Sequence, residues 1–302
     1  MTTRQVTLRK PEDIIAAVPQ LLGFHPHDSL VLMKFRSPGD EQAPTARIDM
    51  PHSLDAWVEV YQVFQPLQPY YNDGRAAIVM FTDDAEASLH TLHSLLVMFP
   101  NVTWIEALRV FEGRYWTADD AFTGPGMPYV AIDPGFGRDP AIGREERARR
   151  FAGEPTEAFE RELDRHANRI MSLNDFRAEA ERLRDVWAKP HTLTDDELGH
   201  TCATVFHPGM RDVVLASITR EHLPMLEDAA RRCGPNEHIL AFAALAAWLA
   251  GDGALAWIAY DRVTALNPDN EAAKVVATAL TDAIPPSVWQ LSPVESLDIF
   301  KS

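Results

Sequence analysis

Apolar residues in the first 35 positions recur first at the spacing of a helix and then without interruption. The helical face consists of Ile14, Ile15, Val18, Leu21 and Leu22. Pro11 suits the first turn of such a helix, Pro19 should bend it or end its regular part, and Gly23 tolerates the left-handed conformation of a helix end. Residues 30–33 are continuously apolar, as in a strand covered on both faces. The pattern predicts a helix, a reversal and a buried strand.

Strand and helix spacings alternate along the next part of the chain. Further strands are predicted at 46–50, 76–81, 102–111 and 114–116. Ser53 and the group Thr82, Asp83 and Asp84 are suitable caps for two helices between these strands. The strand–helix–strand unit over 76–111 predicts a right-handed parallel crossover. The fold class expected for residues 1–143 is therefore α/β, a small mixed sheet flanked by helices.

Glycine and proline are frequent in residues 117–143, and from Arg144 the apolar spacing is helical almost to the end. So long a segment without periodicity is usually either functional or mobile. Further on, the residues Gly251, Ala256, Tyr260 and Pro268 fall at the spacings of a tetratricopeptide repeat, in which small residues let two helices approach closely. Residues 144–302 are therefore expected to form an all-α, tetratricopeptide-like helical domain.

The string LLGFHPHDSLVLM at 21–33 resembles the opening signature of an actinobacterial family known only as a domain of unknown function, number 4192. Similar stretches follow at GRYW (113–116), at MRDV (210–213) and across 241–286. The resemblance implies an architecture and a lineage, and no reaction. Many members carry clustered cysteines after the GRYW-like string, whereas residues 117–129 here read TADDAFTGPGMPY. A metal or redox role built on such cysteines therefore does not transfer to this chain.

Composition narrows the classes of function. The chain has 302 residues, 46% of them hydrophobic, which suits two moderate cores, and 28 Lys+Arg against 44 Asp+Glu give a net charge of −16. No binding to nucleic acid or to membranes is therefore expected. Cys202 and Cys233 lie in apolar helical patterns, which predicts two buried thiols and no disulfide framework. The N-terminal segment MTTRQVTLRK has no apolar core of signal-peptide length, and no apolar run in the chain reaches the length of a membrane span, so a cytoplasmic location is expected.

Two pairs of histidines are candidate metal ligands: His25 with His27, and His90 with His93. Imidazole and carboxylate are common ligands of zinc and iron, and Asp28 follows the first pair. However, Asp28 and Ser29 also suit the hydrogen-bonded turn that enters a strand, and no third ligand is visible near the second pair. No metal and no cofactor are predicted, and Asp28 and Ser29 stay candidate ligand-binding residues.

Polar side chains also follow the strands predicted at 76–81 and 114–116. Asp83 and Asp84 come after a parallel strand, where open α/β sheets place their ligands, although a helix cap explains them as well. Arg114, Trp116 and Asp120 lead into the glycine-rich segment, and this grouping is pocket-like. The candidate catalytic set is Asp83, Asp84, Arg114 and Asp120, and the candidate ligand-binding set adds Arg114 and Trp116 to Asp28 and Ser29.

The motifs GxGxxG, GxxxxGK, GxSxG and HExxH are all absent from the sequence. Their absence, the acidic surface and the repeat-like helices favour a non-enzymatic cytoplasmic protein that binds a protein partner or forms a homo-oligomer. The alternative is a small-ligand-binding or hydrolytic enzyme whose site lies at the carboxyl ends of the strands. An exposed apolar groove in the helical half would support the first hypothesis. A pocket with converging polar side chains at the sheet edge would support the second.

Overall fold

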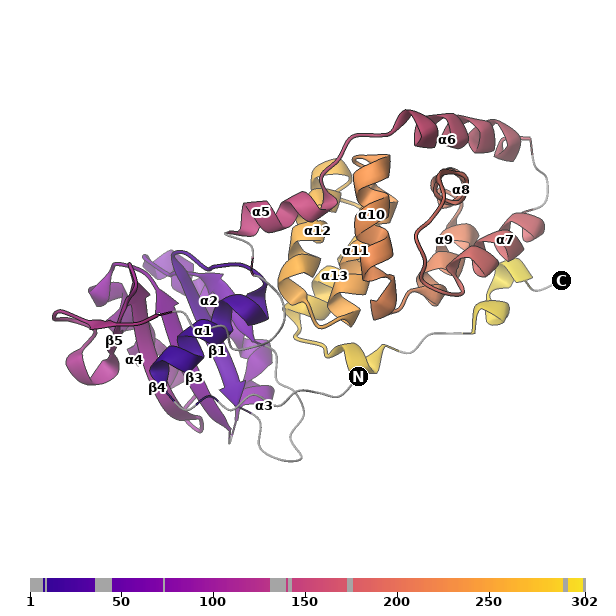
Figure 1. Cartoon of the computed structure of the whole chain (residues 1–302). Coiled ribbons are helices and arrows are strands. Elements are labelled where there is room, and N and C mark those ends of the chain that lie inside the picture. The colour runs from indigo at the N-terminus through magenta and orange to yellow at the C-terminus, as the bar shows by residue number, and fades with distance from the viewer. Residues whose placement is uncertain are drawn as a thin grey trace. The chain divides into compact units, whose positions relative to one another are not determined.

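The computed structural model describes residues 8, 10–35, 45–72, 74–130, 140, 143–172, 176–289 and 293–300. The chain divides into two compact units by its internal contacts. One unit comprises Met1–Arg144 with Thr281–Ala283, and the other comprises Glu145–Leu280 with Ile284–Ser302. The sheet lies in the first unit, and the second unit is helical in its described residues (Figure 1).

A six-stranded mixed sheet forms the centre of the first unit. Across the sheet the strands are β2 (Ala46–Asp49), β1 (Ser29–Phe35), β3 (Arg75–Phe81), β4 (Thr103–Phe111), β5 (Arg114–Thr117) and β6 (Met127–Pro128). β3 and β4 are parallel, and the other described pairings are antiparallel. The predicted α/β class is confirmed. The short β6 was not predicted, because its two residues lie in the glycine-rich segment, where no periodicity marks a strand.

Three helices cover one face of this sheet. They are α2 (Leu54–Phe64), α3 (Gln68–Tyr71) and α4 (Ala85–Met98). One apolar cluster joins alternate strand residues to these helices, and its members include Leu30, Leu32, Ile78, Met80, Phe64, Tyr71, Leu95 and Phe99. Ser53 and Asp84 cap α2 and α4 by accepting hydrogen bonds from the backbone N–H groups of Ala56 and Ala87. Both predicted caps are therefore confirmed.

The helix α1 (Pro11–Leu22) covers the opposite face. The alternate strand residues on that face include Val31, Val79 and Leu108, which are fully buried. In Figure 1, α1 lies in front of the strands, and it packs against β4. Pro19 lies inside α1 and does not end it, because the helix continues to Leu22 and stops at Gly23, whose φ is 72°. The proline sits near the end of the helix, where few backbone hydrogen bonds follow it.

Helices make up the second unit within its described residues. The α-helices are α5 (Arg144–Ala148), α6 (Glu157–Ile170), α7 (Arg177–Trp187), α8 (Asp195–Thr204), α9 (Pro208–Ser217), α10 (Leu223–Cys233), α11 (Glu237–Leu249), α12 (Gly253–Leu266) and α13 (Glu271–Thr281). Their shared core includes the fully buried Trp187 and Phe242. α11, α12 and α13 confirm the helices predicted around the repeat-like spacing. The likeness to a tetratricopeptide repeat itself stays a prediction.

The described part of the C-terminal tail, residues 293–300, packs against the core of the helical unit. Leu297, Ile299 and Phe300 are partly buried there. Cys202 and Cys233 are buried free thiols, as predicted. None of the helices in the described part of the chain combines the length and the apolar content that a membrane crossing requires.

Candidate functional site at the carboxyl edge of the sheet

The parallel strands β3 and β4 end beside a cleft of about 910 Å³ in the first unit. Phe81, Thr82 and Asp83 line it where β3 ends, and Val110 and Phe111 line it where β4 ends. β1 runs antiparallel to β3, so the start of β1 and the residue before it, Asp28, lie at the same edge. Open α/β sheets place their ligands at this edge, and the sequence predicted a site there.

The lining of this cleft combines acidic, imidazole and apolar side chains. Its titratable members are His25, His27, Asp28, His52, Asp83, Glu112 and Tyr129. The apolar members include Ile15 and Pro19 of α1 together with Phe81 and Phe111. Among the described lining residues there is no lysine and no arginine. The cleft therefore presents negative charge and apolar surface to a ligand, without a fixed positive charge.

His52 connects two carboxylates at the edge of the cleft. Its Nε2 lies 2.9 and 3.0 Å from the two carboxylate oxygens of Asp28. Its Nδ1 lies 3.8 Å from Oδ2 of Asp84. The side chains of all three are 44–45% exposed, so solvent or a ligand can reach them. An imidazole in this position can donate a proton through one nitrogen and accept one through the other.

Backbone geometry places Asp28 and Asp84 in this group. Asp28 adopts a positive φ of 43°, a conformation that aspartate tolerates better than most residues, and its carbonyl accepts a hydrogen bond from the N–H of Met50 at 2.9 Å. That bond brings the loop containing His52 beside Asp28. Asp84 accepts a hydrogen bond from Ala87 N through Oδ1 at 2.8 Å, which leaves Oδ2 facing His52. The two interpretations of Asp84, a helix cap and a site residue, are thus compatible.

Arg109, a residue of β4, holds the loop after β3 in place. Its side chain is buried, and its guanidinium donates to the carbonyls of Phe122 at 3.1 Å, Asp83 at 3.2 Å and Thr82 at 3.4 Å. It also lies 3.6 Å from the ring centroid of Trp116. Burial lowers the pKa of Arg109, and the charges of Asp83 and Asp84 raise it. The guanidinium therefore stays charged and ties the loop after β3 to the rest of the unit.

Arg114, Trp116 and Asp120 do not belong to the lining of the cleft. Arg114 is exposed and donates to the carbonyls of Pro125 and Gly126 at 2.9 and 3.1 Å. Trp116 is buried with the cluster under α2 and α4, and its Nε1 donates to the carbonyl of Gly124 at 2.9 Å. Asp120 is exposed in the turn after β5. The predicted catalytic set is therefore divided: Asp83 lines the cleft and Asp84 approaches the lining residue His52, while Arg114 and Asp120 lie elsewhere.

The other candidates have separate positions. Ser29 is buried, donates from Oγ to the carbonyl of His27 at 2.7 Å and accepts from Arg47 at 2.6 and 3.0 Å. It therefore holds the turn before β1 in place. His90 and His93 lie on α4 with exposed side chains, outside the cleft.

His52 and Arg109 were not predicted as site residues, although a feature of the sequence points to each of them. Arg109 is a single charged residue inside the apolar run Leu108–Val110, which indicates a buried charge with specific partners. His52 follows the short strand 46–50, and antiparallel pairing of that strand with β1 would have placed it near Asp28.

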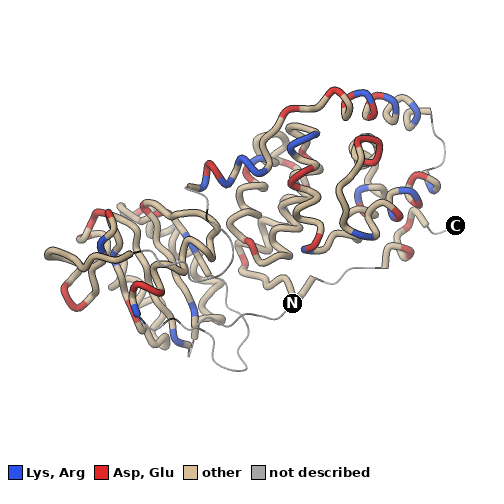
Figure 2. The backbone as a smooth tube through the Cα atoms, viewed as in Figure 1, with Lys and Arg blue, Asp and Glu red and all other residues tan. Residues whose placement is uncertain are grey.

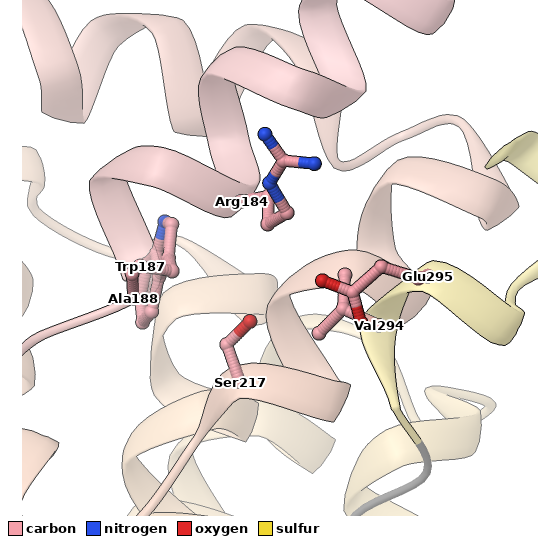
Figure 3. Close-up of a pocket in the computed structure, with 6 residues that line it drawn as sticks. All are labelled: Arg184, Trp187, Ala188, Ser217, Val294 and Glu295. Atoms are coloured by element: carbon pink, nitrogen blue, oxygen red, sulfur yellow. The ribbon is translucent and has the colours of Figure 1, made fainter.

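A smaller cavity of about 330 Å³ lies in the helical unit. Figure 3 shows the residues around it, which are Arg184, Trp187, Ala188, Ser217, Val294 and Glu295. Two of the polar groups are already engaged, because Arg184 pairs with Asp185 at 3.0 Å and Ser217 Oγ donates to the carbonyl of Val213 at 2.8 Å. This cavity is not an extended apolar groove. Binding of a protein partner or of a second copy therefore stays a prediction.

Comparison with known proteins identifies the family. The family described as Domain of unknown function (DUF4192) matches residues 11–287. No curated protein and no solved structure matches the chain. The match extends over most of the sequence and includes the string at 21–33 that first indicated the resemblance. The chain belongs to the DUF4192 family.

Proposed function

We propose that the first unit binds a small amine-bearing molecule with an apolar part in the cleft at the carboxyl edge of β3 and β4. The observation that carries this proposal is the lining: Asp28, Asp83 and Glu112 are present, and no described lining residue is a lysine or an arginine. A ligand with phosphate or carboxylate groups would meet these carboxylates, while Arg109 behind this edge is buried and its N–H groups donate to backbone carbonyls. A ligand with an ammonium group gains from the same charges.

The size and the apolar members of the cleft support the same class of ligand. Pockets that bind small molecules commonly have volumes of about 300–1,000 Å³ and a mostly apolar lining with a few polar groups. Phe81, Phe111 and Tyr129 supply aromatic surface, which also attracts cations. Burial raises the pKa of Tyr129, so its phenol keeps its proton at neutral pH and is available as a donor.

The lining favours binding over nucleophilic catalysis. Its described residues include neither serine nor cysteine. The hydroxyl oxygen of Thr82 accepts a hydrogen bond from the backbone N–H of Asp84 at 3.2 Å, so this hydroxyl stabilises the turn before α4. The exposed carboxylate of Asp28, which lines the cleft beside His52, can accept a hydrogen bond from an ammonium group, and this supports recognition of an amine.

A matched pair of probes tests the role of charge. Phenethylamine and phenethyl alcohol have the same aromatic part, and only the amine is cationic at neutral pH. Titration of the full-length chain, followed by isothermal calorimetry, should show binding of the amine and much weaker binding of the alcohol. Asp83→Asn should weaken amine binding roughly three- to fivefold, the effect of one partly exposed charge pair.

Asp120→Asn is the matched control, because Asp120 is an exposed aspartate of the same unit outside the cleft. It should bind phenethylamine as the wild type does. Equal binding of amine and alcohol would refute the proposal, as would equal losses in the two variants.

A further inference from the structure

The helices α6 and α8 of the second unit approach each other closely at one glycine. A Cβ atom built on Gly199 of α8 would lie 2.8 Å from the backbone of Glu162 and Leu163 in α6. Figure 2 shows acidic and basic residues interleaved along α6 and α7, and some of these charges face this contact. The close approach brings side chains from α6 and α8 together.

Three potential metal-binding donors converge beside this glycine. Glu162 and His166 are one turn apart on α6, and Asp196 lies in the first turn of α8. One donor atom from each lies within 4.8 Å of the other two, and Nε2 of His166 is 2.9 Å from Oδ1 of Asp196. Donors that are each about 2.1 Å from one metal ion are roughly 3–3.5 Å apart, so little movement is needed to share an ion.

A cationic nitrogen already occupies the space among the three donors. Nη2 of Arg165 lies 2.7 Å from Oε2 of Glu162 and 3.0 Å from Nε2 of His166, and it also pairs with Oδ1 of Asp196. Nε2 of His166 therefore lies within hydrogen-bonding distance of both Arg165 and Asp196. Donor atoms of all three residues surround a single positively charged nitrogen, in the position that an ion would take in a shared metal site.

A second buried histidine lies close to His166. His200 is fully buried one turn after Asp196 on α8, and its ring lies 5.2 Å from the ring of His166. Its Nε2 is 2.6 Å from Oε2 of Glu179, which Arg169 holds in turn. Its Nδ1 is buried and has no hydrogen-bond partner among the described residues. His200 therefore lies beside the three donors and adds a buried polar group to their surroundings.

We propose that Glu162, His166 and Asp196 bind a divalent first-row transition-metal ion such as Zn²⁺ in the position that Arg165 now takes. Mixed imidazole and carboxylate donors select such ions over Mg²⁺ and Ca²⁺, which prefer oxygen alone. This site lies entirely within the second unit and is independent of the amine cleft.

The surrounding arginines allow this exchange. The Arg165 side chain is 58% exposed, so it can move into solvent when an ion arrives. Arg182 pairs with the other carboxylate oxygen of Asp196, Oδ2, and leaves Oδ1 for the metal. Arg169 is held by Glu179, and its Nη2 lies 3.4 Å from Nδ1 of His166, which is the ring nitrogen on the far side from Asp196. The ion therefore has to displace a single guanidinium.

Calorimetric titration of the chelator-treated full-length chain with Zn²⁺ tests the site, with Mg²⁺ as the comparison ion. We expect the wild type to bind Zn²⁺ and to unfold at a higher temperature when Zn²⁺ is present. His166→Ala should lose at least about tenfold in affinity for this binding event. Arg165→Gln should bind Zn²⁺ roughly three- to tenfold more tightly, because the competing charge is gone.

His90→Ala is the matched control, because it removes an exposed imidazole on α4 of the first unit, outside the cleft, and should keep the event that His166→Ala loses. A purely structural ion-pair cluster would give no gain in Arg165→Gln. That result would overturn the proposal, as would equal Zn²⁺ binding by His166→Ala and the wild type. If His166→Ala does not fold by circular dichroism, Glu162→Gln replaces it, since Glu162 is 22% exposed and tolerates change better.

Discussion

Replacing Arg109 by methionine should destabilise the first unit and loosen the cleft. Methionine has a similar length but cannot donate hydrogen bonds, so the carbonyls of Thr82, Asp83 and Phe122 lose their donor inside the protein. Because Arg109 is only 6% exposed, water does not replace the lost bonds. The loop after β3, which carries Asp83 into the cleft, loses its side-chain attachment to β4 and keeps the backbone hydrogen bond from Thr82 N–H to the carbonyl of Val110.

The size of the effect follows from the geometry. Hydrogen bonds from a charged donor contribute about 1.5–3 kcal/mol each. The bonds to Phe122 and Asp83 at 3.1 and 3.2 Å are well formed, and the one to Thr82 at 3.4 Å is weaker. Taking the lower figure for the two short bonds gives a loss of about 3 kcal/mol. For a unit of this size that corresponds to a fall in Tm of roughly 6–12 °C.

Arg114→Met is the matched comparison for this experiment. Arg114 also donates to two backbone carbonyls, at 2.9 and 3.1 Å, but it is exposed, so water can take its place. Its loss should cost less than about 1 kcal/mol. Urea unfolding followed by circular dichroism and tryptophan fluorescence measures both variants, and calorimetry measures phenethylamine binding. Equal stability losses in the two variants would refute the reasoning, because burial would then not decide the strength of these bonds.

Three further predictions concern glycine contacts and a buried histidine. Gly126→Ala should destabilise the first unit by about 2 kcal/mol in urea unfolding, because Gly126 has a φ of 65° and an added Cβ would lie 2.5 Å from Cε2 of Trp116; an unchanged unfolding midpoint would contradict the contact. Gly199→Ala should force α6 and α8 apart and lower stability by roughly 1–3 kcal/mol in the same assay, and wild-type stability would mean that these helices are not in backbone contact. Burial lowers the pKa of His222 from its ordinary 6.5, against hydrogen bonds with Trp187 and Thr219 that raise it. In the unfolded chain His222 is protonated near its ordinary pKa, whereas in the folded chain it is protonated only at lower pH. The contribution of neutral His222 to folding stability is therefore complete above the ordinary pKa and is lost as the pH falls. His222→Gln should flatten the decline of the urea midpoint between about pH 7 and pH 5, and a slope equal to that of the wild type would exclude this contribution.

The sequence alone determined the secondary structure and the class of the fold. The apolar run at 30–33 became the buried strand β1, and the strands predicted at 102–111 and 114–116 became β4 and β5, with positive φ values at Glu112 and Gly113 between them. Such features depend on a few neighbouring residues, because apolar spacing, caps and turn conformations act within one or two turns of chain. The same local reasoning identified Asp83 and Asp84 at the end of a strand.

Only the tertiary structure decided which of these residues meet. His52 reaches Asp28 across 24 positions, and Asp196 reaches His166 across 30. Trp116 and Arg114 do not line the cleft with Asp83. Trp116 is buried under α2 and α4, whereas the cleft includes residues of α1 on the other face of the sheet. Successive strand residues point to opposite faces, so the face on which each side chain lies depends on how the strands pair. Pairing depends in turn on burying apolar surface from distant segments at once, which no short stretch of sequence encodes.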